Sequence, residues 1–373
     1  MTALEQAWWA WPPSPGQRAA LAPLLPLELA FRGLVALRGL AYDRRWASVA
    51  SAAAPVISVG NVAVGGAGKT PVALAIATRL AARGRRVAVL SRGYGALRTD
   101  ARLVADGERV LLSAAEGGDE PVLLARRLPG VLVLCGPRRA ELATLATGAH
   151  GANALLLDDG FQHRALARDL DVVVLDAANP FGNRHLLPVG PNREPRAAIH
   201  RAGLVWLSRV DQAEPERLER LRVLAFRYTG RGPVESRHAP LDLLDGALAR
   251  SLGLAAARGK RVLLLSGLAR PGAFRRTVEG LGAEVVAERR HPDHHRFTVA
   301  DLDAARWAAD EARAELIVTT EKDAVKLSPE LAADARLAVV RIEAEILSGD
   351  ASLQAALDAA LAAGDRRGPG NRP

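Results

Sequence analysis

Residues 56–71 have the sequence VISVGNVAVGGAGKTP, and this stretch decides the fold class. Its first four residues predict a buried strand, and the glycine-rich loop is followed by an apolar, helix-forming segment over residues 72–83. A strand, a glycine-rich loop and a helix in this order are the context of the Walker A phosphate-binding loop. The strict motif has glycine where this chain has Ala63, and a small residue is a tolerable substitute. The stretch therefore predicts a nucleotide-binding α/β protein.

The residue types of the loop indicate its chemistry. Glycines let successive backbone N–H groups turn toward phosphate oxygens, and the N-terminus of the following helix adds positive potential. Lys69 is expected to act on the β- and γ-phosphates, and Thr70 to place its hydroxyl on Mg²⁺. The predicted nucleotide-binding residues here are Gly65, Gly66, Ala67, Gly68, Lys69, Thr70 and Pro71. The alternative, a glycine-rich turn with a chance Gly-Lys-Thr, is disfavoured by the order of strand, loop and helix.

Short apolar runs alternate with helix-length segments along the rest of the chain. Strands are expected at residues 86–90, 131–134, 154–157, 172–175, 261–265, 284–287 and 316–318, with helices near 273–281 and 299–313. This pattern predicts an α/β fold of the P-loop NTPase type, a doubly wound, mostly parallel sheet with a second, smaller α/β domain. The expected divisions are an N-terminal helical region (1–50), a nucleotide-binding domain (51–230), the smaller domain (231–363) and a disordered tail (364–373).

The composition bounds the class of protein. With 49% hydrophobic and 24% charged residues, the 373-residue chain is neither disordered nor fibrous. A single cysteine, Cys135, excludes a disulfide framework and a multi-cysteine zinc site. The net charge of +9 indicates an anionic partner such as nucleic acid, anionic lipid or a phosphorylated substrate. Nucleic acid is disfavoured, because no recognised binding motif occurs and only 4% of residues are aromatic.

The longest apolar stretch lies near the N-terminus, at residues 21–42. Glu28, Arg32 and Arg38 interrupt it, so it is a poor candidate for a membrane-spanning helix. On a helical wheel these charges share one sector, and leucines at positions 27, 29, 34, 37 and 40 lie opposite. Tryptophans before the stretch and arginines after it suit a membrane–water interface. A helix lying on a membrane and a helix packed on the protein's own core remain open alternatives.

A second site signal follows the strand predicted at residues 154–157. Asp158 and Asp159 come directly after it, at the sheet edge where ligands bind in open α/β proteins. Two adjacent carboxylates are costly unless a cation neutralises them, and Mg²⁺ would do so. A solvated turn is the ordinary alternative for Asp-Asp-Gly. The guanine-specific Asn-Lys-x-Asp motif is not apparent, which weakly favours ATP over GTP.

Several motifs then occur in a fixed order along the chain. They are GNVAVGGAGKTP (60–71), SRGYG (91–95), GDEP (118–121), DDGFQH (158–163), FGN (181–183), LLPVGP (186–191), RE (193–194), DHH (293–295) and TEKDAVK (320–326). Their order and spacing resemble the tetraacyldisaccharide 4'-kinases of lipid A biosynthesis, a family of P-loop kinases, over nearly the whole chain. His185 and Asn192 depart from the family pattern at positions to which no chemistry is assigned.

The resemblance implies a kinase at the cytoplasmic face of the bacterial inner membrane, peripheral or anchored by its N-terminus. The enzyme would use ATP and Mg²⁺ to phosphorylate the 4'-hydroxyl of a tetraacylated glucosamine disaccharide 1-phosphate, which gives lipid IV-A. The implied partners are this lipid and the membrane surface, with no nucleic acid and no obligate protein partner. The residues themselves agree at three points, which are the predicted Mg-nucleotide site, the apolar N-terminal stretch and the surplus of arginine.

The resemblance also implies roles for individual side chains. Asp119 is the candidate catalytic base, and Glu120 contributes to a Mg²⁺ shell with Thr70, Asp158 and Asp159. A carboxylate is a weak base at its ordinary pKa, and His294 from the second domain is the family-matched partner that would assist it. Asp119, His294 and Lys69 form the predicted catalytic set. Arg92 and Tyr94 are placed with the nucleotide-binding residues, with the lipid headgroup as the alternative ligand.

Other interpretations stay open at this point. Asp119 and Glu120 could be an acid pair that the dipole of a helix N-terminus favours. Histidines 291, 294 and 295 with Asp293 could be a solvated loop, or a zinc site, which is disfavoured without cysteine or a helical histidine pair. For the whole chain, the main alternative is a membrane-recruited P-loop ATPase switch that hydrolyses ATP without an acceptor hydroxyl.

Overall fold

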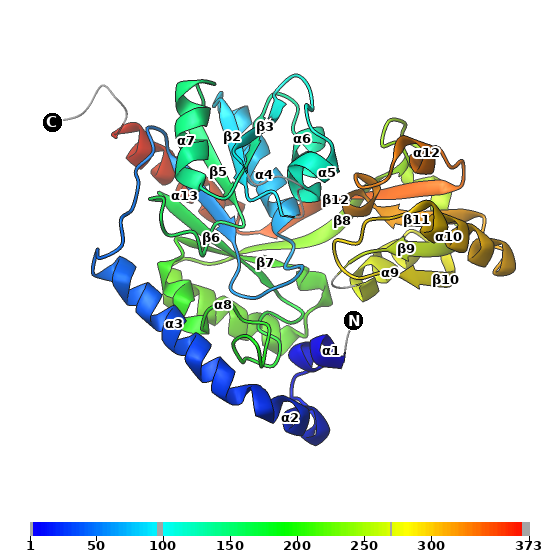
Figure 1. Cartoon of the computed structure of the whole chain (residues 1–373), viewed down its shortest axis with the longest axis horizontal. Helices are drawn as coiled ribbons and strands as arrows, with labels where there is room; N and C mark the ends of the chain where they lie inside the picture. The colour runs from blue at the N-terminus through cyan, green and yellow to red at the C-terminus, as the bar shows by residue number, and fades with distance from the viewer. Residues whose placement is uncertain (1–2, 95–99, 269–270, 368–373) are drawn as a thin grey trace.

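The computed structural model describes residues 3–94, 100–268 and 271–367 (Figure 1). The strands are β1 (Val56–Gly60), β2 (Val87–Ser91), β3 (Arg102–Asp106), β4 (Leu132–Cys135), β5 (Ala154–Asp158), β6 (Leu170–Asp176), β7 (Leu204–Ser208), β8 (Val234–Asp245), β9 (Arg261–Ser266), β10 (Glu284–Arg290), β11 (Leu316–Thr320) and β12 (Leu337–Ser348).

The α-helices are α1 (Ala3–Trp9), α2 (Pro15–Leu21), α3 (Leu25–Asp43), α4 (Lys69–Ala82), α5 (Ala114–Gly117), α6 (Asp119–Arg127), α7 (Arg139–Gly148), α8 (Pro215–Thr229), α9 (Pro271–Gly280), α10 (Val299–Glu311), α11 (Glu321–Ala324), α12 (Pro329–Ala332) and α13 (Asp350–Asp365). Short 3₁₀ helices are η1 (Ala22–Leu24), η2 (Arg196–Arg201), η3 (Val210–Gln212) and η4 (Leu254–Ala257). The strands and helices predicted from the apolar runs are all present, with bounds that shift by a few residues.

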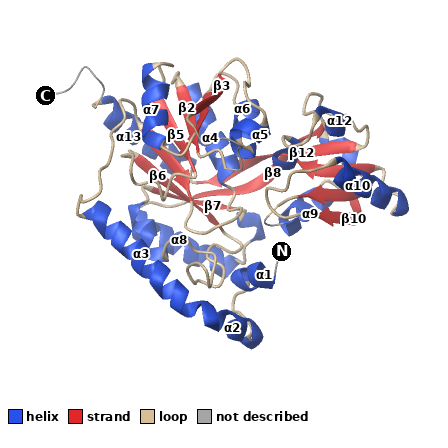
Figure 2. Cartoon of the chain, viewed as in Figure 1, coloured by secondary structure: helices blue, strands red, loops and turns tan. Residues whose placement is uncertain are grey.

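The described strands form one 12-stranded sheet in the order β10-β9-β11-β12-β8-β7-β6-β1-β5-β2-β4-β3. Neighbours are parallel except in the pairs β3–β4 and β8–β12. The last pair is long, and its two strands run from one half of the molecule into the other (Figure 2). The predicted mostly parallel α/β fold with a smaller second unit is confirmed. The first unit holds strands β1–β7 with helices α4–α8 and α13, and the second unit holds β9–β11 with α9–α12. One continuous sheet joins the two units through β8 and β12.

Helices cover both faces of the sheet in each unit. In the first unit, α4, α6 and α13 bury their apolar residues against one face, and α7 and α8 pack against the other. In the second unit, α9 and α10 lie on opposite faces of strands β9 and β11. This double winding leaves the carboxyl ends of the parallel strands at one edge, which is where ligands bind in such sheets.

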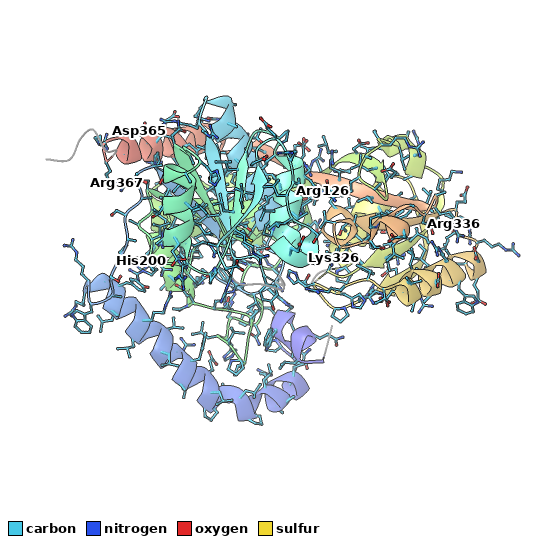
Figure 3. The ribbon with its side chains drawn as sticks, turned by 45° about the horizontal axis from the view of Figure 1, so that its top comes forward. Arg126, His200, Lys326, Arg336, Asp365 and Arg367 are labelled. Atoms are coloured by element: carbon cyan, nitrogen blue, oxygen red, sulfur yellow. The ribbon has the colours of Figure 1, made fainter. Side chains whose placement is uncertain are left out.

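The C-terminal helix α13 returns to the first unit after β12. Leu353, Leu357 and Leu361 belong to the same buried core as α4 and β1. Asp365 and Arg367 lie at the end of α13 (Figure 3). Arg85 pairs with Asp365, and Arg367 pairs with Asp169. The predicted tail therefore begins with ordered residues, and its part 368–373 lies outside the described residues, as does Gly95 of the SRGYG motif. The domain boundaries at 230 and 363 stay predictions.

The N-terminal helices lie along the outside of the first unit, with α3 close to α8 in the view of Figure 1. One helical stretch, Pro15–Asp43, is long and apolar enough to cross a membrane by length and composition alone, which is weak evidence near an N-terminus. The loop between β6 and η2 holds this region. The Trp8 indole donates to the Pro188 carbonyl at 2.9 Å, and the Asn183 backbone N–H donates to the Trp8 carbonyl at 2.7 Å. The FGN and LLPVGP motifs thus have a docking role in this structure.

Candidate active site

The phosphate-loop residues form a tight turn between β1 and α4. Gly65 and Gly68 have φ values of +85° and +84°, a region that favours glycine. The Ser208 hydroxyl donates to the Ala67 carbonyl at 2.7 Å, so the end of β7 supports the turn from below. A Cβ atom on Gly68 would lie 2.7 Å from Nε2 of His238. Glycine at position 68 is therefore required by both conformation and space.

Two buried groups behind the loop were not predicted from the sequence. Arg209 donates to the Gly66 carbonyl at 2.5 Å and to the Asp176 carboxylate at 2.6 Å. Burial and the charge of Arg209 lower the pKa of His238 to about 3, so its imidazole is neutral at physiological pH. Arg209 directly follows β7 and His238 lies within β8, and neither belongs to a recognisable motif. Arg209 holds the loop backbone through Gly66, and His238 limits the space beside Gly68.

Lys69 points to the second acid of the Asp-Asp pair. Its Nζ lies 3.2 Å from Asp159 Oδ1 and 3.4 Å from Asn61 Oδ1, and Arg193 donates to Asp159 at 2.8 Å. Burial alone would raise the pKa of Asp159, but Lys69 and Arg193 hold it well below its usual value. The carboxylate of Asp159 therefore has two cationic partners.

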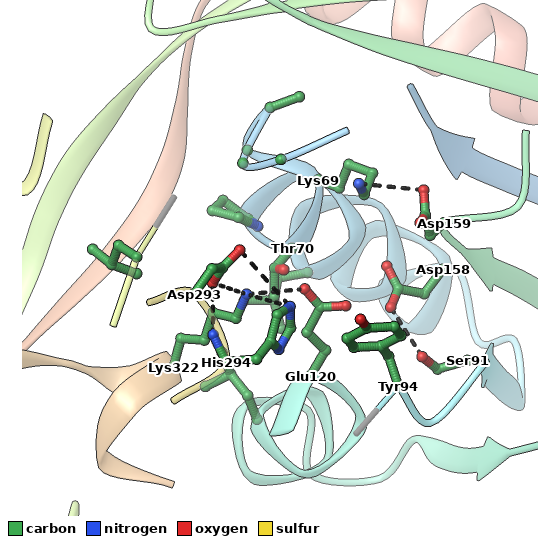
Figure 4. A pocket seen from close by; sticks show the side chains of 18 of the residues that line it. Lys69, Thr70, Ser91, Tyr94, Glu120, Asp158, Asp159, Asp293, His294 and Lys322 are labelled. Atoms are coloured by element: carbon green, nitrogen blue, oxygen red, sulfur yellow. Dashed lines mark hydrogen bonds and ion pairs between the residues drawn. The ribbon is translucent and has the colours of Figure 1, made fainter. Parts of the chain in front are cut away.

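Asp158 has a different environment. Its carboxylate accepts a hydrogen bond from Ser91 Oγ at 3.1 Å, and it is buried. Burial and the nearby carboxylates of Glu120 and Asp159 raise its pKa to about 7. Thr70, Glu120 and Asp158 lie around one space in Figure 4 and line the same cavity. A hydroxyl and two carboxylates that lack sufficient positive charge suit a hard cation such as Mg²⁺.

Asp119 and His294 come from different units and contact each other. His294 Nδ1 lies 2.8 Å from Asp119 Oδ2, and the Glu120 backbone N–H donates to Asp119 Oδ1 at 2.9 Å. Asp119 begins α6 after Gly118, whose φ of +90° and close approach to Tyr94 exclude larger residues. Burial alone would raise the pKa of Asp119, but His294, Lys322 and Lys326 outweigh it and lower the pKa. The carboxylate is thus ionised and oriented. The structure brings the predicted pair together.

Lys322 also enters the site, although the sequence favoured a surface position for it over a contact with phosphate. Burial would lower its pKa, but Glu120, Asp293 and Asp119 raise it, so the ammonium stays charged. The sequence offered only the TEKD motif, in which a surface charge is the ordinary explanation of a lysine. Lys322 reaches the site because the fold packs α11 against α6.

The cavity that holds these groups has a volume of about 890 Å³. Its lining includes all the predicted nucleotide-binding, metal and catalytic residues except Asp119, which lies behind His294. Tyr94 packs at a tilt against His294 with ring centroids 5.0 Å apart, so it lies beside the partner of the candidate base. Residues on a further wall are mostly cationic and include Arg38, Arg92, Arg139 and Arg193. That wall suits an anionic group.

His163 lies within the cationic wall. Burial and the charges of surrounding arginines lower its pKa to about 4, so it adds no further positive charge at neutral pH. Arg38 comes from α3 and donates to the Gln162 carbonyl at 2.6 Å. The apolar N-terminal helix therefore contributes directly to the cavity, which its position in the sequence did not indicate.

His291 and His295 form a separate group with Asp301 beside the site. His291, His295 and Asp301 offer three possible metal-binding atoms within 4.8 Å of one another. Asp301 already accepts hydrogen bonds from His295 at 2.9 Å and from the backbone and hydroxyl of Thr298 at 2.8 Å. These hydrogen bonds explain the cluster as a structural support for the loop of residues 291–298.

The fold and the site together define a P-loop phosphotransferase, with a Walker A loop, an acid pair after β5 and an acid–histidine pair shared by two units. Comparison with known proteins gives the particular family. The family model described as tetraacyldisaccharide-1-P 4'-kinase (LpxK) matches residues 20–362, and the chain belongs to this family.

Relatives and a solved structure agree. A tetraacyldisaccharide 4'-kinase of Anaeromyxobacter sp. (strain Fw109-5) is 68% identical over 365 residues, which is 98% of each chain. That of Geobacter sulfurreducens is 39% identical over 346 residues, or 91% of this chain and 94% of the relative. LpxK of Aquifex aeolicus, crystallised in complex with ATP, has a TM-score of 0.74 at 28% identity and covers 92% of this chain and 99% of its own.

Proposed function

We propose that this protein transfers the γ-phosphate of ATP to the 4'-hydroxyl of a tetraacylated glucosamine disaccharide 1-phosphate, giving lipid IV-A. The observation that carries the proposal is the convergence, on one cavity, of the Walker A loop and the Asp119–His294 pair. A nucleotide hydrolase needs the first feature, whereas a kinase also needs a base directed at an acceptor hydroxyl.

The chain's own residues supply binding, orientation and proton acceptance. The loop at residues 65–71 would hold the phosphates with its backbone N–H groups, and Lys69 would leave Asp159 for the phosphates as they enter. Asp119, ionised and oriented by His294, would accept the proton of the attacking hydroxyl. Thr70, Glu120 and Asp158 would hold Mg²⁺, which would neutralise charge on the phosphates. Arg92 and Tyr94 line the same cavity, and Tyr94 would border the acceptor because its ring contacts His294.

The substrate class fits two further features. The cationic wall of the cavity suits a lipid that already carries a phosphate. The exposed leucines of α3, with Leu29 67% and Leu34 65% exposed, suit a bilayer surface from which an acylated acceptor would enter. Because α3 is docked to the protein along its polar side, we place it flat on the membrane. The cytoplasmic face of the inner membrane is the proposed location, since ATP is available there.

The test is a transfer assay on the full-length protein with γ-labelled ATP, Mg²⁺ and the disaccharide 1-phosphate lipid in mixed micelles. The wild-type protein is expected to label the lipid. Lys69→Ala should reduce the rate by at least about 10²–10³-fold, the usual effect of removing one group that stabilises charge in the transition state. Lys260→Ala is the matched control, because Lys260 is an exposed lysine that pairs with Glu315 away from the cavity.

Two results would contradict the proposal. Near wild-type transfer by a folded Lys69→Ala variant would remove the phosphate-loop assignment. Release of labelled inorganic phosphate at the same rate with and without lipid would favour the ATPase switch instead.

A further inference from the structure

Lys322 is the second residue of α11, and its ammonium group lies between the two units. Its Nζ is 3.2 Å from Asp293 Oδ1, 3.3 Å from His294 Nε2 and 3.5 Å from Glu120 Oε1 (Figure 4). Asp293 and His294 belong to the second unit, whereas Glu120 belongs to α6 of the first. A lysine ammonium has three N–H donors, and these three neighbours match that number.

The contact with His294 determines where the imidazole proton lies. An ammonium group can only donate, so the ring nitrogen that faces it at 3.3 Å must accept with its lone pair. That nitrogen is Nε2, and the ring proton of the neutral imidazole must then be on Nδ1. Nδ1 faces Asp119 Oδ2 at 2.8 Å, so His294 donates to the candidate base. Asp119 and Lys322 therefore contact opposite nitrogens of the same imidazole ring.

The contact between Lys322 and His294 is necessary because Asp293 competes with Asp119 for the imidazole proton. Asp293 Oδ2 lies 3.8 Å from His294 Nε2, and a carboxylate there would attract a proton onto Nε2. The imidazole thus lies between two carboxylates, and only one of them is the candidate base. Lys322 occupies the Asp293 side, since its ammonium contacts both Asp293 and Nε2.

We propose that Lys322 is a positioning residue that holds His294 in its Nδ1–H tautomer and so directs the imidazole N–H to Asp119. The proposal rests on the proposed function in that Asp119 is taken as the base, but the tautomer itself can be observed without any reaction. It gives the TEKD motif a role in the active site.

The neighbours of Lys322 fix its backbone. Glu321 accepts from Arg127 of α6 at 2.6 Å and from Arg341 of β12 at 2.8 Å, and it is buried. Asp323 accepts from the Gly267 backbone N–H at 3.0 Å and pairs with Lys326 at 2.7 Å. Glu321 therefore binds α11 to α6 of the first unit, and Asp323 binds α11 to the second unit. Such support is what an oriented side chain requires.

The experiment measures histidine ¹⁵N NMR shifts, which distinguish the two tautomers, on the nucleotide-free, full-length protein. A His294→Gln variant identifies the His294 signals. In the wild type we expect a protonated Nδ1 and a bare Nε2. In Lys322→Met, Nε2 should acquire a proton shared with Asp293. Lys322→Arg should keep the wild-type tautomer, because it retains N–H donors. Lys260→Met is the control and should change nothing.

Kinetics supply the second measurement. Lys322→Met should lower kcat by about 10- to 100-fold, a part of the ~10²–10⁴-fold that general base catalysis supplies, with KM for ATP within about twofold of the wild type. Lys322→Arg should restore much of kcat. A double variant, Lys322→Met with Asp293→Ala, removes the competing carboxylate and should return the proton to Nδ1.

Three results would overturn the inference. The first is a protonated Nε2 in the wild type, which needs no variant and so does not depend on any variant folding. The second is a wild-type tautomer in folded Lys322→Met, even with a lower kcat. The third is a Lys322→Arg protein with the tautomer of Lys322→Met. A wild-type protein that shows the expected tautomer but labels no lipid would instead contradict the proposed function alone.

Discussion

Helices α3 and α13 are close in length and composition, yet they pack in opposite ways. They have 19 and 16 residues, and both are rich in leucine and alanine. In α13 the leucines at positions 353, 357 and 361 are buried in the core of the first unit. In α3 the leucines at positions 27, 29, 34 and 37 are between 57% and 67% exposed, whereas Glu28 is 3% exposed. One helix buries its apolar side, and the other buries a charged side chain.

The polar side of α3 holds it against the protein. Glu28 accepts from the Leu186 backbone N–H at 2.9 Å, Arg38 donates to the Gln162 carbonyl, and Arg164 pairs with Asp43. A helix packed on its own core would bury the leucines instead. An apolar surface of this kind, flanked by tryptophan and arginine, is typical of a membrane-interface helix. The comparison therefore favours the membrane alternative over the core alternative for the N-terminal stretch.

The largest expected effect tests the burial difference directly. Leu357→Ala in α13 should lower the free energy of unfolding by about 2–5 kcal/mol, because it leaves a cavity in a close-packed core. Leu34→Ala in α3 should change it by less than about 0.5 kcal/mol, as is usual at exposed positions. Chemical denaturation of both variants in detergent-free buffer measures the two values. Equal losses of stability would show that α3 is a core helix after all.

The second expected effect is on membrane binding, which the α3 variant should weaken more than the α13 variant. Each leucine that enters the bilayer interface contributes on the order of 1.4 kcal/mol, so Leu34→Ala should weaken partitioning to anionic vesicles by about tenfold. Leu357→Ala should bind vesicles as the wild type does, provided that it is folded. Val299→Ala is the control for an exposed apolar residue, since Val299 lies on α10 in the second unit. Vesicle co-sedimentation measures the three affinities.

If Leu34→Ala and the wild type partition equally, the leucines of α3 do not contact the bilayer. The exposed face would then need another partner, and the proposed entry of the lipid along α3 would lose its support.

Apolar periodicity predicted much of the sheet but not the elements that join its halves. β1, β5 and β9 are short apolar runs between turn residues, a clear signal of buried strands. β8 and β12 are buried only in short blocks and contain several charges, so their 12-residue length was not apparent. The position of α13 depends on packing between residues about 300 apart in sequence, which no local pattern encodes.

The site residues also divide into those that the sequence predicted and those that it did not. The Walker A residues and the acid pair follow strands at predictable places, so their convergence follows from the topology. The pairing of Asp119 with His294 was implied by family resemblance, and the observed 2.8 Å contact agrees with it, although their roles stay predictions. The positions of Lys322, Arg38 and His238 in the site were not predicted, because each depends on contacts between distant elements. A single polar or charged residue has no local feature in the sequence that separates a surface position from a site position.

The smallest expected effect concerns the attachment of α3 through Glu28. Burial alone would raise the pKa of Glu28, but the Leu186 backbone N–H, His185 and Arg32 outweigh it and lower the pKa below the usual 4.5. A carboxyl group with a lowered folded-state pKa contributes stability above its unfolded pKa and loses it as the pH falls through the folded value. The attachment of α3 should therefore be complete at pH 7 and should weaken below about pH 4.5.

Hydrogen exchange of the Leu186 amide measures this attachment, because that N–H donates to Glu28 Oε1 at 2.9 Å. Glu28→Gln keeps one acceptor but loses the charge, so protection of the Leu186 amide at pH 7 should fall by about 1 kcal/mol, the usual net value of one hydrogen bond. The variant should also lose the additional acid sensitivity that the wild type shows below about pH 4.5. Glu216→Gln, at an exposed position of α8, is the control and should match the wild type. Equal acid sensitivity in Glu28→Gln and the wild type would show that other contacts hold α3, and the buried charge would then not be what turns its leucines outward.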